Sequence, residues 1–113
     1  MDEAALKKQI YSLISLCSRA SLLRTGEEKC EKTLRNGEAG LVIISGDASA
    51  NTKKKFINKA FYYNVPAFIY GSKEELGKLA GKGSASSLCV TDNNLSVKIK
   101  NLIELSMENL RGE

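Results

Sequence analysis

Cationic side chains recur at short intervals between positions 24 and 35. Lys29, Lys32 and Arg35 follow at three-residue spacing on one face of a predicted helix, and Arg24 stands just before it. Cations placed in this way can contact phosphate oxygens or the O6 and N7 atoms of guanine, and a helix N-terminus adds its own positive pole. A solvated basic surface is the competing interpretation, and the residues alone leave both open.

The start of this helix carries a second signal. Thr25 and Glu28 form a capping-box pattern, and Gly37 is placed to end the helix in a left-handed conformation. A capping-box glutamate bonds the backbone amide of the capping residue, so the pattern favours a capping role for Glu28 over ligand contact. Gly26 is either a permissive turn residue or a point where an RNA backbone can approach closely.

Catalysis has little support in the sequence. There is no histidine, which removes the commonest general base and metal ligand. Asp47 follows a predicted strand at its carboxyl end, where α/β sheets often bind ligands. Asp47 and Ser49 more often satisfy backbone amides at such a turn. We therefore predict no catalytic residues and no enzyme, and keep a small α/β enzyme using Asp47 as a weaker alternative.

Composition indicates one domain over residues 1–113, with a net charge of +4 and a pI near 9.0 that favour an anionic partner. Cys17, Cys30 and Cys89 are far apart in apolar patterns, which predicts reduced core thiols rather than disulfides or a metal site. No apolar run reaches the roughly 18 residues that a membrane span needs. We expect a cytoplasmic protein with no metal and no membrane contact.

Hydrophobic periodicity predicts helices and strands in strict alternation. Phe56, Ile57, Ala60 and Phe61 are expected to face inward from the third helix, with the run Lys53 to Lys55 as a solvated face. The predicted fold class is α/β, a three-layer α/β/α sandwich with a mixed sheet of about four strands. Helices are expected over about 3–19, 25–37, 53–62, 72–81 and 92 to the C-terminus, and strands over about 21–24, 41–44, 67–70 and 88–91.

Several of these segments together resemble a known family. The chain is similar, in one register over about residues 6 to 105, to the ribosomal L7Ae/L30e family and particularly to its short bacterial YlxQ-like members. That resemblance implies the α/β/α sandwich and RNA binding, typically to kink-turns, which are sharply bent helices with tandem sheared G·A pairs. The segments that carry it are Thr25-Gly26, Lys32, Arg35-Asn-Gly37, Leu41-Val-Ile-Ile44, Asp47-Ala-Ser49, Asn51-Thr52, Asn64-Val-Pro66 and Glu75-Leu-Gly77.

The resemblance also implies which residues read the RNA. In the family a Gly-x-Asn-Glu-x-x-Lys pattern opens the second helix and enters the RNA groove, and Gly26 and Lys32 match it. Glu28 stands at the asparagine position and Lys29 at the glutamate position, so the chain departs from the pattern at both base-reading places. A one-residue shift of the helix start would exchange the roles of Glu27 and Glu28.

The loop before the last strand is the family's second RNA contact. It follows a helix and opens a strand, which is the wrong context for a dinucleotide-binding motif despite its glycines. Ala85 is its only aliphatic side chain, so we expect docking through backbone amides and lysine, with moderate affinity and pronounced salt dependence. The implied loop contacts are Lys82, Gly83, Ser84, Ala85 and Ser86.

The sequence thus predicts a monomeric, cofactor-free protein that binds structured, kink-turn-like RNA, with ribosomal RNA as a candidate. A protein-interaction module of the same fold that has lost RNA binding is the main alternative, because the departures at Glu28 and Lys29 would allow it.

Overall fold

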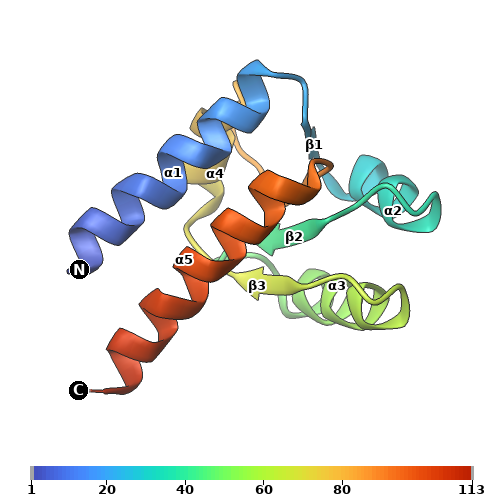
Figure 1. Cartoon of the computed structure of the whole chain (residues 1–113). Coiled ribbons are helices and arrows are strands. Elements are labelled where there is room, and N and C mark those ends of the chain that lie inside the picture. The colour runs from blue at the N-terminus through green and yellow to red at the C-terminus, as the bar shows by residue number, and fades with distance from the viewer. Residues whose placement is uncertain (1, 113) are drawn as a thin grey trace.

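A computed structural model describes residues 2–112, so Met1 and Glu113 of the predicted domain lie outside the described residues. Helices and strands alternate along the whole described chain, as the periodicity predicts (Figure 1). The elements are α1 (Glu3–Arg19), β1 (Leu23–Thr25), α2 (Glu27–Arg35), β2 (Leu41–Ile44), α3 (Ala50–Tyr62), β3 (Ala67–Ile69), α4 (Lys73–Leu79), β4 (Ser87–Val90) and α5 (Asn93–Arg111).

The four strands form one mixed sheet in the order β1-β4-β2-β3. β2 pairs parallel with β3 and antiparallel with β4, and β1 pairs antiparallel with β4. The fully buried strands β2 and β4 occupy the centre, which explains the apolar runs Leu41 to Ile44 and Leu88 to Val90, while β1 and β3 are the edges. The predicted mixed sheet of about four strands is confirmed.

Side chains alternate between the two faces of the sheet and build two cores. Leu41 and Ile43 face the core formed with α1, α4 and α5, whereas Val42 and Ile44 face the core formed with α2 and α3. Figure 1 shows α1 and α5 side by side on one face, with α2 and α3 on the other. The three-layer α/β/α sandwich is therefore confirmed.

Polar side chains cap four of the helices, beginning with Asp2, which accepts the amide of Ala5 at the start of α1. The side chains of Ser49, Ser72 and Asp92 accept the amides of Thr52, Glu75 and Leu95, at the starts of α3, α4 and α5. At the other end of α2, Gly37 takes the predicted left-handed conformation with φ +73°. These caps fix where each helix begins or ends relative to the sheet.

The expectation for the inward face of α3 is wrong in part. Phe56 and Ala60 are buried, but Ile57 is 43% exposed and Phe61 is 85% exposed. Ile57 and Phe61 lie about 100° further round the helix, and β3 is an edge strand with no further strand beyond it to cover them. The apolar pattern predicts the helix correctly, but it does not show how much of the helix surface the sheet covers.

All three cysteines are buried free thiols, as expected. Burial raises the pKa of Cys17 to about 11, which keeps this side chain a neutral thiol. Cys30 and Cys89 lie in the core behind α2. Within residues 2–112, none of the helices combines the length and the apolar character that crossing a membrane requires.

Candidate nucleic-acid interface

The chain enters α2 through an unusual backbone turn at Gly26. Thr25 is held in β1 by pairing with Leu88, and the Gly26 amide donates to the Ser87 carbonyl at 3.1 Å. The chain therefore remains tied to β4 up to Gly26, which becomes the N-cap with φ +100° and ψ 159°. This conformation is readily adopted only by glycine.

The predicted capping box at the start of α2 is consequently wrong. Gly26 has no side chain to cap with, and the helix start shows no side-chain capping hydrogen bond. Thr25 is committed to the sheet, so Glu28 has no capping partner there and its side chain is exposed. The physical reason is that sheet pairing over three residues outweighs one local cap, which is typically worth about 1 kcal/mol. Glu28 is thus available for contact with a ligand.

Replacing Gly26 by alanine tests the importance of this turn. A methyl group there would meet no described atom within 4 Å, so the cost is backbone strain alone. We expect Gly26→Ala to lower the free energy of unfolding by about 1 to 3 kcal/mol, measured by urea denaturation. The control is Gly83→Ala, where an added methyl group also meets no described atom within 4 Å but φ is not left-handed. Equal losses of unfolding free energy in the two variants would contradict backbone strain at Gly26 as the cause.

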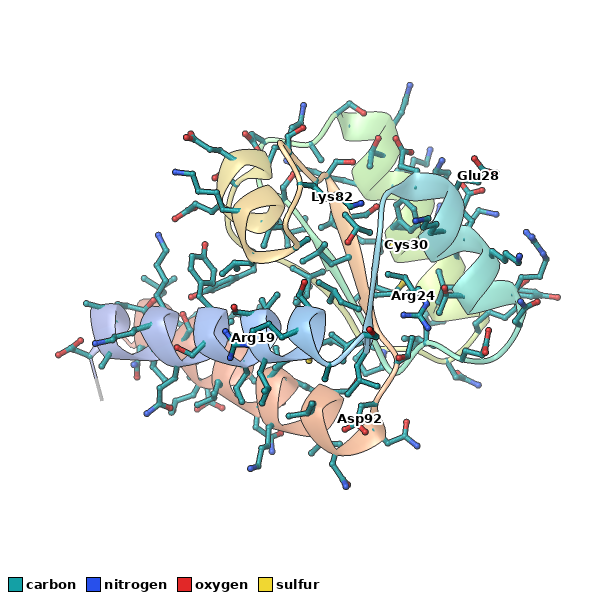
Figure 2. The ribbon with its side chains drawn as sticks, turned by 90° about the horizontal axis from the view of Figure 1, so that it is seen from above. Arg19, Arg24, Glu28, Cys30, Lys82 and Asp92 are labelled. Atoms are coloured by element: carbon teal, nitrogen blue, oxygen red, sulfur yellow. The ribbon has the colours of Figure 1, made fainter. Side chains whose placement is uncertain are left out.

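A surface groove of about 600 Å³ lies beside α2. It gathers four predicted cations from separate parts of the chain: Arg24 from β1, Lys29 and Lys32 from α2, and Lys82 from the turn after α4. Figure 2 shows Arg24 and Lys82 along the β1 segment that leads into α2, with Glu28 at the start of that helix. We call this feature the basic groove. Its lining is Ser18, Ser21, Leu23, Arg24, Thr25, Lys29, Lys32, Thr33, Asn36, Glu38, Ala80 and Lys82.

Arg24 is oriented by the backbone beside it. Its Nη1 donates to the carbonyl oxygens of Ser21, at 3.0 Å, and of Leu23, at 3.1 Å. Ser21 has a positive φ of 60°, which shapes the turn between α1 and β1 that presents these carbonyls. A guanidinium carries five N–H donors, so the group retains donors for an anion while its position is fixed.

Other predicted site residues lie outside the basic groove. Glu27 faces α3, where its carboxylate pairs with Lys55 Nζ at 2.8 Å, so the two neighbouring glutamates have different surroundings. Glu28 and Arg35 are exposed and lie seven residues apart on the outermost face of α2, between the groove and α3. The groove and the outer face of α2 are therefore adjacent but distinct.

The loop after α4 is only partly exposed. Gly83 and Ser84 are exposed, but the Ala85 side chain is 4% exposed and packs in the core with α1 and α5. Ala85 is also anchored through its amide to the Lys73 carbonyl at 3.0 Å, and the Ser86 carbonyl accepts the amide of Ser45. Ala85 thus holds the loop in place and offers almost no side-chain surface to a ligand.

Several groove residues had no signal in the sequence. Ser18, Ser21 and Asn36 line the groove because the end of α1 and the end of α2 meet at β1. Serine and asparagine near helix ends are ordinary capping or turn residues, so only the folded arrangement identifies them as part of the groove.

Asp47 serves a structural purpose. Its Oδ1 accepts the amide of Lys73 at 2.8 Å, which joins the loop after β2 to the first residue of α4. This backbone hydrogen bond is the main cause that lowers the pKa of the Asp47 carboxyl. Among the described residues no cluster of acidic, cysteine or histidine side chains is suited to hold a metal ion.

Comparison with known proteins identifies the family. Residues 8–100 match the ribosomal protein L7Ae/L30e/S12e/Gadd45 family. The chain belongs to this family. The predicted resemblance to the L7Ae/L30e family and its YlxQ-like members is confirmed, because the chain is 40% identical over 98 residues to RNA-binding protein YlxQ of Enterococcus faecium, covering 87% of this chain and 94% of that protein.

Solved structures of similar proteins agree on the L7Ae-type fold. A protein of unknown function from Bacillus halodurans is 39% identical, with a TM-score of 0.81 and coverage of 84% of this chain and 96% of that one. The Giardia lamblia 15.5kD RNA binding protein is 20% identical, with a TM-score of 0.79 and coverage of 94% and 92%. The latter likeness concerns the fold alone.

Proposed function

We propose that this protein binds structured RNA through the basic groove and the start of α2, without catalysing a reaction. The observation that carries the proposal is the convergence of Arg24, Lys29, Lys32 and Lys82 on one groove. Four cations around one groove can each contact a phosphate of a nucleic-acid backbone. Membership of the L7Ae/L30e family and similarity to RNA-binding protein YlxQ support RNA as the anion.

The finer part of the proposal is recognition of a kink-turn-like bend, with ribosomal RNA as a candidate, by a monomeric single domain in the cytoplasm. Gly26 permits close approach of the RNA backbone because it carries no side chain. Glu28, free of a cap, can accept the N1–H and N2–H groups of guanine. Arg35 adds positive charge, and the loop contacts the RNA through the exposed backbone of Gly83 and Ser84, since the Ser86 carbonyl is held by the Ser45 amide.

Titration with two labelled RNAs tests this function. A kink-turn RNA should bind more tightly than a straight duplex of equal length, because only the bent RNA presents sheared G·A edges to the start of α2. Both affinities should fall with salt, since cations in the groove displace counterions from phosphates. Measuring both RNAs at two salt concentrations separates shape recognition from charge. Equal affinity for the two RNAs would remove kink-turn specificity.

The departures at Glu28 and Lys29 favour one alternative, a protein-interaction module of the same fold without RNA binding. A pull-down from lysate with and without nuclease treatment distinguishes the two functions. Partners that persist after nuclease treatment, together with no measurable affinity for either RNA, would replace our proposal by this alternative.

A further inference from the structure

A long stretch of the chain carries positive charge and aromatic rings but no carboxylate. Between Asp47 and Glu74 there is no aspartate or glutamate, whereas five lysines and six of the seven aromatic residues fall there. Most of this stretch is α3 and the turn after it. Such a composition favours an anionic partner that also offers flat surfaces for stacking.

Two aromatic rings at the end of α3 project into solvent. Phe61 is 85% exposed and Tyr62 is 78% exposed. Tyr63 supports the second ring edge to face, with ring centroids 4.9 Å apart and an interplanar angle of 88°. Large aromatic side chains normally bury most of their surface in the fold, so two adjacent exposed rings indicate a binding surface.

The neighbouring helix does not cover these rings. α2 and α3 run in the same direction and in step, because Thr52 contacts Glu27 at 3.5 Å and Lys55 pairs with both Glu27 and Glu31. α2 ends at Arg35, opposite the region of Lys59, so α3 continues for nearly one further turn beyond it. Phe61 and Tyr62 occupy this last turn.

Two lysines precede the exposed rings along α3, one near the face of each ring. Lys54 lies seven residues before Phe61 and so shares its face of the helix, and Lys59 lies three residues before Tyr62. Among the described residues, Lys55 is the α3 lysine that forms ion pairs with α2 carboxylates, at 2.8 Å from Glu27 and 2.6 Å from Glu31. We call Lys54, Lys59, Phe61 and Tyr62 the α3 surface.

We propose that the α3 surface is a second RNA-binding site, on which bases of a single-stranded segment stack against Phe61 and Tyr62 while Lys54 and Lys59 contact the phosphates. The site is separate from the basic groove, whose lining includes no α3 residue. A protein partner fits the surface less well, because lysine is depleted at the centres of protein interfaces. Stacking on aromatic rings beside cations is the usual way to bind single strands without sequence preference.

The absence of tryptophan from the chain permits a direct test. Phe61→Trp places a single tryptophan in the α3 surface, and titration with a 12-nucleotide oligoadenylate should quench its fluorescence because adenine stacks on the indole. Val97→Trp is the matched control, since Val97 is 53% exposed on α5, across the sheet from α3. Quenching confined to the Phe61 position supports the proposal; no quenching, or equal quenching in both variants, overturns it.

Loss of the rings gives an independent readout. Replacing Phe61 and Tyr62 together by alanine should weaken oligoadenylate binding about tenfold, whereas Phe61→Trp retains it. Both side chains are largely exposed, so the double variant should remain folded. Unchanged affinity in the folded double variant would overturn the proposal.

A third variant separates this site from the groove. With Lys29, Lys32 and Lys82 replaced by alanine in the Phe61→Trp background, oligoadenylate should still quench the tryptophan. Persistent quenching supports a separate site even where kink-turn binding fails. The experiment therefore tests the α3 surface independently of the proposed function of the basic groove. Abolished quenching would assign the single strand to the groove and overturn the α3 proposal.

Discussion

Removing three cations from the basic groove should weaken binding of a kink-turn RNA about a hundredfold at low salt. The variant replaces Lys29, Lys32 and Lys82 by alanine, and each lost contact to a phosphate costs on the order of 1 kcal/mol. All three side chains are exposed around one groove. The slope of log affinity against log salt should also become shallower by about three, because each phosphate contact contributes about one.

The matched control removes three positive charges elsewhere. Lys8 and Lys98 line a different groove, between α1 and α5, and Arg111 lies near the end of α5. All three are exposed, so their replacement by alanine changes the net charge by the same amount with little effect on stability. Filter binding at several salt concentrations compares the two variants. Equal losses would show that net charge, rather than the basic groove, controls RNA binding.

The sequence predicted the elements and their order because burial imposes a strong local pattern on this fold. The run Leu41 to Ile44 has no polar residue, and it forms a strand covered by helices on both faces. Ser72 and Glu75 have the same capping-box spacing, and α4 begins there, inside the predicted helix 72–81, because no sheet pairing competes for Ser72. Local sequence patterns therefore predict an element correctly where no long-range contact favours a different local conformation.

Tertiary demands explain the elements that were mispredicted. The same capping pattern fails at Thr25, because pairing with Leu88 keeps that residue extended and moves the helix start to Gly26. Strand order is likewise invisible in local periodicity, so the exposure of Ile57 and Phe61 beside the edge strand β3 was unforeseen. In both cases a long-range neighbour decides the outcome.

The candidate site also contains residues that local sequence patterns predict and residues that they do not. Helical spacing alone placed Lys29 and Lys32 on one face, and they line the groove together. Lys82 is about 50 residues away in sequence, and only the family resemblance indicated it. The resemblance likewise indicated Ala85, whose burial follows from how the loop packs under α4 rather than from its composition. Assembly of the groove is thus a property of the fold.

Gly77→Ala should lower the free energy of unfolding by about 3 kcal/mol or more, although alanine is the better helix former. In an open helix position this change would stabilise by about 1 kcal/mol. Here the added Cβ would lie 2.5 Å from Ser84 Cα and 2.7 Å from Ser84 N, both backbone atoms that a side-chain rotation cannot move. Overpacking of this kind typically costs about 1 to 3 kcal/mol and occasionally more. The clash therefore outweighs the gain in helix propensity, and the substitution lowers the free energy of unfolding.

The same substitution should weaken RNA binding, because relief of the clash requires the loop after α4 to move away. The Lys82 amide donates to the Gly77 carbonyl at 2.7 Å, so displacing the loop also displaces a cation of the basic groove. Gly81→Ala is the control: its Cβ meets no described atom within 4 Å, and only its φ of +71° opposes alanine, at about 1 to 2 kcal/mol. Urea denaturation monitored by circular dichroism measures both variants. A stabilised Gly77→Ala protein would mean that α4 and the loop are not in close contact, and that the loop is free to position Lys82 in another way.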